Sequence, residues 1–155
     1  MNITIRNAEE KDLPQMIGLI KELAIFENAG DQVTNSVEQM CTEKEFFNCF
    51  VAERLDNKEI VGMALYYFAY YTWVGKSLYL DDLYIKQAFR GHKIGSKLLQ
   101  KLFDVAKTEN CKRVRWQVLD WNEPAVKLYK KMGAKLDSEW HNCDFDIKTI
   151  QKVTI

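Results

Sequence analysis

The residues best suited to chemistry form a glycine-containing loop, residues 87–96, which follows a predicted strand and opens a predicted helix. The first N–H groups of a helix have no partner within it and lie at the positive end of its dipole. Such a loop binds phosphate oxygens, and Gly91 and Gly95 would let a pyrophosphate come close to the backbone. The spacing is neither that of a P-loop nor that of a Rossmann fingerprint. The sequence therefore predicts a pyrophosphate site, with an ordinary strand-to-helix turn as the alternative.

Two adjacent carboxylates, Asp81 and Asp82, lie in the strand before this loop. Carboxylates within a run of Leu, Tyr and Ile residues are costly to bury without a partner. Consecutive strand residues point to opposite faces unless a β-bulge intervenes, and bulges recur beside active sites. A cationic amine would provide the missing partner. We therefore expect a functional role for the pair, with a location at the sheet edge as the alternative.

A second segment, residues 118–134, predicts a helix. Asn122 is placed to cap it, Pro124 lies in its first turn and Gly133 ends it. Tyr129 lies inside this helix at helical spacing from its apolar neighbours, which by itself is typical of a core aromatic residue.

The elements that must position these residues follow from hydrophobic periodicity. Helical spacing predicts helices from Asp12, which can cap the first one, from Ser36 to near Phe46, and after Gly95. The predicted strands are residues 3–5, 47–53, 60–68, 78–85, 114–119 and 140–147. We therefore expect an α/β fold of mixed type, with helices on both faces of a mixed sheet, in one domain of residues 1–155.

Composition limits the classes of function. The chain has 155 residues, of which 47% are hydrophobic and 28% charged, as in a globular domain with a core. Its 22 basic and 22 acidic residues cancel, which argues against attraction to nucleic acid or anionic membranes. No apolar run is long enough to span a bilayer, and residues 1–6 lack the order of a signal peptide. We expect a cytoplasmic protein that binds neither nucleic acid nor a membrane.

The cysteines indicate no metal centre. Cys41, Cys49, Cys111 and Cys143 include no C-x-x-C pair, and their spacing from the two histidines is not that of a zinc site. We expect reduced thiols and no metal.

The loop and the second helix together resemble the GNAT superfamily of acetyl-CoA-dependent N-acetyltransferases. Residues 87–96 resemble its Arg/Gln-x-x-Gly-x-Gly/Ala pyrophosphate loop, and residues 122–129 resemble its Asn-x-x-Ala-x-x-Leu-Tyr helix. Lys93 is a departure, because it stands where the middle glycine is usual. Residues 78–82 and 121–124, among other segments, are similar to the diamine acetyltransferase family, which includes spermidine/spermine and thialysine N-acetyltransferases. The resemblance implies a GNAT fold and, as in that family, a homodimer.

The resemblance also implies catalytic roles. Tyr129 would be the general acid that protonates the sulfur of coenzyme A. Asp81 stands where the family carries a glutamate that takes a proton from the amine, and its shorter side chain favours a water relay. Tyr71 stands where the polyamine enzymes carry an aspartate, which favours a shorter amine or an amino acid.

The binding residues are likewise implied by the resemblance. For acetyl-CoA they are Leu83, Tyr84, Ile85, Arg90, Gly91, His92, Lys93, Ile94, Gly95, Ser96, Asn122, Glu123, Pro124, Ala125 and Tyr129. For the amine substrate they are Phe26, Glu27, Asp81, Asp82, Arg115, Trp116 and Gln117.

The predicted function is acetyl transfer to a small primary amine, such as a thialysine-like amino acid, a diamine or a polyamine, in a ternary complex. Two alternatives remain open at this point. One is acetylation of a protein or peptide amine. The other is a regulatory domain that binds acetyl-CoA without turnover and needs neither Tyr129 nor Asp81.

Overall fold

The computed structural model describes residues 2–154, and the chain divides into two compact units, Met1–Gln117 and Val118–Ile155. The first unit holds a five-stranded sheet in the order β1-β2-β3-β4-β5. Its strands are β1 (Ile3–Asn7), β2 (Asn48–Arg54), β3 (Ile60–Tyr71), β4 (Gly75–Ile85) and β5 (Arg113–Arg115). The strands β1 to β4 are antiparallel to their neighbours, and β5 runs parallel to β4.

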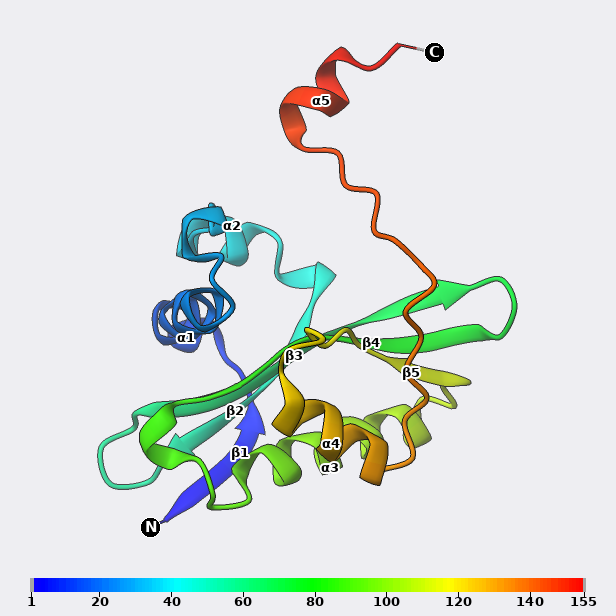
Figure 1. The fold of residues 1–155 in the computed structure, drawn as a ribbon. Coiled ribbons are helices and arrows are strands. Elements are labelled where there is room, and N and C mark those ends of the chain that lie inside the picture. The colour runs from blue at the N-terminus through cyan, green and yellow to red at the C-terminus, as the bar shows by residue number, and fades with distance from the viewer. Residues whose placement is uncertain (1, 155) are drawn as a thin grey trace. The chain divides into compact units, whose positions relative to one another are not determined.

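Helices cover both faces of this sheet (Figure 1). The helices α1 (Leu13–Phe26) and α2 (Val37–Thr42) lie on one face, and α3 (Ile94–Thr108) lies on the other. On the α1 side, the buried core includes Met16, Leu19, Met40, Val51 and Met63. On the other side, α3 buries Ile94, Leu98, Leu99, Leu102 and Ala106. The mixed sheet between two helical layers confirms the predicted fold class.

The second unit contains α4 (Glu123–Lys131) and α5 (Ile147–Lys152). Asn122 occupies the N-cap position of α4 and Pro124 lies in its first turn, as predicted. Gly133 follows the helix with a φ of 92°, a left-handed conformation that glycine adopts without strain. The sequence therefore identified both ends of α4, although the Asn122 side chain itself makes no capping hydrogen bond.

The predicted strand at residues 140–147 is wrong. Residues 140–146 have no regular structure, and the Asp146 carboxylate accepts from the Thr149 N–H at 2.8 Å to cap α5. The apolar residues that suggested the strand, Trp140 and Phe145, are exposed. Alternation alone does not make a strand, because a strand is stable only when it pairs with a neighbour and buries one face.

Smaller differences concern where elements begin and end. The strand predicted at 114–119 is β5, which ends at Arg115. The helix predicted to run from Ser36 to near Phe46 ends at Thr42, and a separate 3-10 turn covers Lys44–Phe46. Asp12 does not cap α1 with its side chain, because its carboxylate accepts hydrogen bonds from Arg6 and from the Glu9 N–H.

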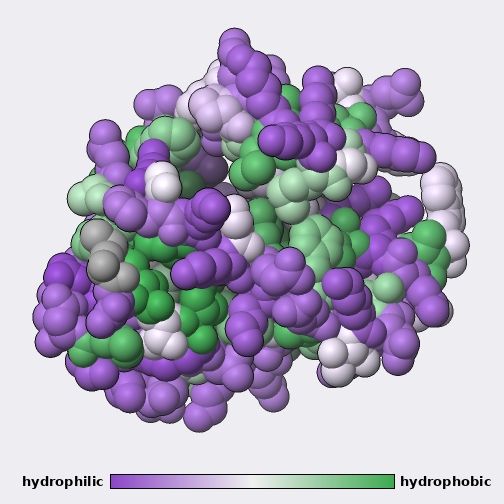
Figure 2. All heavy atoms as spheres, turned by 90° about the horizontal axis from the view of Figure 1, so that it is seen from below, coloured by the Kyte–Doolittle hydropathy of each residue, from purple (hydrophilic) through white to green (hydrophobic). Residues whose placement is uncertain are grey.

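Hydrophilic side chains cover most of the face shown in Figure 2, with hydrophobic side chains in smaller patches between them. Within residues 2–154, no helix is both long enough and apolar enough to cross a membrane.

Candidate active site

A β-bulge in β4 places the two adjacent aspartates. Leu65 of β3 pairs with Asp82, whereas the next residue, Tyr66, pairs with Leu80, so Asp81 is the extra residue of the bulge. Asp82 and Tyr84 pair with Leu65 and Met63, which belong to the core on the α1 side of the sheet. The bulge therefore interrupts the strict alternation of the strand next to a carboxylate that faces α1.

Three carboxylates form an acidic cluster on this side: Asp81, Asp82 and Glu27, which caps the C-terminus of α1. Burial, and then the negative charges of Asp81 and Glu27, raise the pKa of Asp82 to about 7. Loss of hydration beside neighbouring groups also raises the pKa of Asp81 and of Glu27, although both side chains remain in part accessible to solvent. Between residues 2 and 154, no ion pair joins any of these three carboxylates to a cation. The cluster therefore suits a cationic or proton-donating ligand.

Two stacked tyrosines continue this surface toward the hairpin between β3 and β4. The rings of Tyr67 and Tyr79 lie with their centroids 5.2 Å apart and an interplanar angle of 26°. Burial raises the pKa of both phenols, and the charge of nearby Asp81 raises them further. The sequence did not single out these two tyrosines, although Tyr67 and Tyr79 are direct partners across the strands.

The last residue of β5 and the residue that follows it lie on opposite faces of the sheet. The guanidinium of Arg115 lies 4.9 Å from the centre of the Tyr71 ring, on the side of the acidic cluster. Trp116, the next residue, has its ring 6.3 Å from that of Phe103 of α3, on the other side. Gln117 is exposed and ends the first unit. Of these three predicted substrate residues, the structure brings Arg115 to the carboxylate side.

The edge of β4 is open beside the acidic cluster. Within the first unit, β5 pairs with β4 only along Ser77–Tyr79, so Leu80–Ile85 has no strand partner on that edge. Lys86 donates from its N–H to the Val61 carbonyl at 2.9 Å, so these two residues form a hydrogen-bonded pair of β3 and β4. Hydrogen-bonded and non-hydrogen-bonded pairs alternate along an antiparallel ladder. The backbone groups of Leu83 and Ile85 therefore point to the open edge, whereas those of Tyr84 point to β3.

The loop before α3 exposes helix N–H groups. Gly91 has a φ of 81°, and Lys93, the N-cap of α3, has a φ of 60° with no side-chain cap. A Cβ atom at Gly95 would lie 3.2 Å from Ile85, so the glycine lets the helix start close to β4. The His92 ring nitrogen turns back to the carbonyls of Phe89 and Arg90, at 3.3 and 3.0 Å. Ile94, Gly95 and Ser96 form the first turn, whose N–H groups have no acceptor within the helix and receive no side-chain cap.

Arg90 connects this loop to α1. Its guanidinium lies 5.4 Å from the centre of the Phe26 ring and 5.5 Å from that of Tyr84, and it donates to the Ile85 carbonyl at 3.0 Å. The Tyr84 hydroxyl in turn donates to Glu22 at 3.1 Å. Phe26, predicted as a substrate residue, is thus in contact with a residue predicted to bind the cosubstrate.

The predicted residues of the second unit lie at the start and in the middle of α4. Asn122, Glu123, Pro124 and Ala125 form the N-cap and first turn. Tyr129 is half-buried, and burial raises the pKa of its phenol, so the phenol carries its proton at neutral pH.

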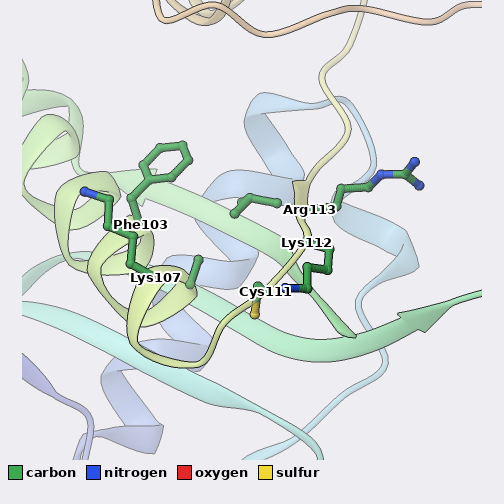
Figure 3. Close-up of a pocket in the computed structure, with 7 residues that line it drawn as sticks. Phe103, Lys107, Cys111, Lys112 and Arg113 are labelled. Carbon is green, nitrogen blue, oxygen red and sulfur yellow. The ribbon is translucent and has the colours of Figure 1, made fainter. Parts of the chain in front are cut away.

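A cavity of about 270 Å³ lies between α3 and β5 (Figure 3). It is lined by Phe103, Ala106, Lys107, Cys111, Lys112, Arg113 and Val114, none of which was predicted as a site residue. Figure 3 shows the guanidinium of Arg113 pointing away from the cavity, in agreement with its position 5.2 Å from the Tyr71 ring. The part of the chain that the structure describes contains no group of three or more residues that could hold a metal ion.

Comparison with known proteins identifies the family. Residues 17–134 match the model of the acetyltransferase (GNAT) family. Thialysine N-epsilon-acetyltransferase of Sus scrofa is 39% identical over 98% of this chain and 97% of its own length. Spermidine/spermine N(1)-acetyltransferase-like protein 1 of Homo sapiens is 38% identical over 88% of this chain and 21% of its own. In fold, the chain is similar to glucosamine-6-phosphate N-acetyltransferase of Arabidopsis thaliana, with a TM-score of 0.75, 22% identity and coverage of 94% and 100%. The chain therefore belongs to the GNAT family of acetyltransferases, as its sequence motifs predicted.

Proposed function

We propose that this N-acetyltransferase transfers the acetyl group of acetyl-CoA directly to a small primary amine in a ternary complex. The observation that carries the proposal is the acidic cluster of Glu27, Asp81 and Asp82, which adjoins stacked tyrosine faces and the open edge of β4. Carboxylates and aromatic faces both attract an ammonium group. The thialysine N-acetyltransferase relatives favour an amino acid with a side-chain amine, and the spermidine/spermine relative leaves diamines and polyamines as further candidates.

Acetyl-CoA, the cosubstrate of the family, fits the residues around α3. The unpaired N–H groups of Ile94, Gly95 and Ser96 would bind the pyrophosphate, helped by the left-handed turn at Gly91 and Lys93. Arg90 and His92 would shape this loop from its N-terminal side. The backbone groups of Leu83 and Ile85 would form hydrogen bonds with the amides of pantetheine, which would lie along the edge of β4 like an added strand. Tyr84, between them, would contribute its side chain to the adjoining surface. Asn122, Glu123, Pro124 and Ala125 would flank the same chain.

The amine must lose a proton before it attacks, since an alkylammonium group (pKa about 10.4) has no free electron pair. Asp81 would take this proton, directly or through water. Asp82 would hold the amine beside it, and its raised pKa lets it accept a proton near neutral pH. The nitrogen then forms a bond to the acetyl carbon, and the carbon–sulfur bond breaks.

The leaving thiolate needs a proton, which Tyr129 would donate, and the attacking nitrogen then loses its second proton, which restores the Tyr129 phenol. This role requires that Asp81 of the first unit and Tyr129 of the second act on one thioester. We propose that the two units make up one catalytic domain, and the family match across residues 17–134 supports this.

Steady-state assays of coenzyme A release test the proposal. The amine panel is thialysine, lysine, ornithine, diamines and spermidine, with lysine-containing peptides as the competing class. We expect turnover with at least one small amine and little with the peptides. Tyr129→Phe should lower kcat by about 10²- to 10⁴-fold with little change in acetyl-CoA affinity. Tyr70→Phe, at a tyrosine that is 78% exposed on β3, is the matched control. Turnover only with peptides, or an unaffected Tyr129→Phe variant, would contradict the proposal.

A homodimer and a cytoplasmic location remain predictions from the sequence. Light scattering on the purified protein measures the first. All four cysteines are free thiols in the structure, which is compatible with the reducing conditions of the cytoplasm.

A further inference from the structure

The face of the sheet that carries the acidic cluster has both a negative and a positive charge close to Tyr79. Tyr79 lies close enough to both Asp81 and Arg115 that the two charges shift its pKa in opposite directions, the carboxylate upward and the guanidinium downward, beneath the larger effect of burial. Arg115 is the direct neighbour of Tyr79 in the parallel pair of β4 and β5. Negative charge therefore lies beside Tyr79 along β4, at Asp81, and positive charge lies beside it across the sheet, at Arg115 on β5.

The two arginines of β5 have unused donors. In the described structure Arg6 and Arg54 form ion pairs with carboxylates, and Arg90 donates to a carbonyl. The guanidinium groups of Arg113 and Arg115, by contrast, lie over the Tyr71 ring, at 5.2 and 4.9 Å from its centre, and neither forms a hydrogen bond or an ion pair within residues 2–154. A guanidinium stacked on an aromatic ring is held in position while its N–H groups stay directed outward, and this fork matches a carboxylate in two hydrogen bonds.

The spacing of the two charged ends suits a small molecule. Asp81 and Tyr79 are two residues apart in β4, and Arg115 is one strand away, so the Cα atoms of Asp81 and Arg115 are separated by roughly 8 Å. An α-amino acid with an amine at the end of a three- or four-carbon side chain spans a similar distance between its terminal nitrogen and its carboxylate. The tyrosine faces between the two ends would contact its methylene groups.

We propose that Arg115, supported by Arg113, binds the α-carboxylate of the substrate and thereby makes the enzyme selective for diamino acids over diamines. This inference rests on the proposed function, since it takes the amine beside Asp81 as the nitrogen to be acetylated. The substrate lies along Tyr79 with its terminal amine at the acidic cluster and its carboxylate at Arg115. A plain diamine would place its second ammonium group against the two arginines without the carboxylate that offsets this charge in the amino acid, which is unfavourable.

Pairs of substrates that differ only in the carboxylate test this inference. The pairs are lysine with 1,5-diaminopentane, ornithine with 1,4-diaminobutane, and thialysine with its decarboxylated analogue. For the wild type, we expect kcat/KM to be at least about 10-fold higher for the amino acid of the best pair. Arg115→Gln should lower kcat/KM for that amino acid by about 10- to 100-fold through KM, as expected for a lost charged hydrogen bond. The same variant should leave the diamine unchanged or improve it.

Controls separate carboxylate binding from a structural role. Lys112→Gln removes an exposed cation next to β5 that lines the cavity on the α3 side, and it should leave the ratio of the two substrates unchanged. Arg115→Lys should restore part of the preference, because it returns the charge without the fork. Thermal unfolding of each variant shows whether the fold is retained.

The possible results are distinct. If the wild type acetylates no small amine, the proposed function itself fails. If it acetylates amines without preferring the carboxylated member, or if Arg115→Gln weakens both members of a pair equally, the proposed function stands and the carboxylate site is refuted. A loss confined to the amino acid supports the site.

Discussion

Two groups of acidic side chains in the first unit differ in whether a cation neutralises them. Asp12 and Glu53, only 3% and 7% exposed, are both bonded to the guanidinium of Arg6, and this lowers the pKa of each carboxyl. We call these three residues the Arg6 cluster. In the acidic cluster of Glu27, Asp81 and Asp82, no such cation is present among the described residues, and the pKa of each carboxyl is raised.

The difference separates a structural from a functional use of the same chemical group. The Arg6 cluster ties β1 to β2 and to the turn before α1, and its charges satisfy one another. The acidic cluster keeps charges that repel one another and resist burial, which lowers stability unless a ligand supplies the counter-charge. Removing a charge should therefore be damaging to the fold in the first cluster and damaging to activity in the second.

Asp81→Asn should have the largest effect, and on activity. If Asp81 takes the proton from the amine, kcat should fall by about 10²- to 10⁴-fold at neutral pH. The deficit should narrow as the pH approaches the pKa of the amine, because the free amine then needs no base. The melting temperature should not fall, since the variant removes an unpaired charge whose pKa is already raised in the folded protein. Rate–pH profiles and thermal unfolding measure both, with exposed Asp31→Asn as control. A parallel loss at every pH would exclude the base role.

Arg6→Met should have the next largest effect, and on stability. It leaves the buried carboxylate of Asp12 without its cation, which costs about 3 kcal/mol in the free energy of unfolding. Urea denaturation at pH 7 measures this loss. Specific activity of the remaining folded protein should be close to that of the wild type, because the Arg6 cluster lies outside the proposed site. An Arg6→Met variant with the free energy of unfolding of the wild type would show that the Arg6 cluster does not stabilise the fold.

Asp82→Asn should stabilise the protein at neutral and alkaline pH and have no effect on stability at acidic pH. The folded pKa of about 7 lies above the ordinary value of 3.8, so the folded state holds the proton more tightly than the unfolded state. Stability should therefore fall as the pH rises from about 4 to about 7 and stay low above it. At pH 8 the free energy of unfolding of the variant should exceed that of the wild type by roughly 1 to 4 kcal/mol. The upper limit corresponds to a shift of about three pKa units. The gain should vanish near pH 4.

The matching variant in the other cluster should show the opposite sign. Asp12 has a lowered pKa in the folded protein, so its contribution to stability is present at pH 8 and is lost as the pH falls below about 4. Asp12→Asn should therefore destabilise at pH 8. If both Asn variants shifted stability in the same direction at pH 8, the contrast between the clusters would be refuted.

Much of the fold could be predicted from the sequence, because its local signals and its packing agree. The helical spacing of Leu98 and Leu102 predicted α3, and the β-rich run from Leu78 to Ile85 predicted most of β4. The failed strand at residues 140–147 had the alternation but no partner to pair with. Whether a strand pairs depends on residues far away in the chain, and a local pattern does not contain that information.

The candidate site could be predicted in part, for a similar reason. The adjacent aspartates indicated either a bulge or an edge, and the register of β3 and β4 shows the bulge. The stack of Tyr67 on Tyr79, the place of Arg90 between Phe26 and Tyr84, and the division of Arg115 from Trp116 all arise from pairing across strands or between elements. These contacts could not be predicted from residue types and their spacing, because contacts across strands depend on the register of the strands.

Glu27→Gln should have the smallest effect on stability, and it tests directly whether Glu27 belongs to the acidic cluster. Glu27 is exposed at the end of α1, so its removal should change stability by less than about 0.5 kcal/mol. Its negative charge, however, helps to raise the pKa of Asp82, so the variant should lower that pKa from about 7 toward its ordinary value. Carbon-13 NMR titration of the aspartate carboxyls measures the shift directly. Glu43→Gln, an exposed change at the end of α2, should leave the titration unmoved. An unchanged Asp82 titration in Glu27→Gln would mean that burial and Asp81 alone set this pKa, and that Glu27 is not part of the cluster.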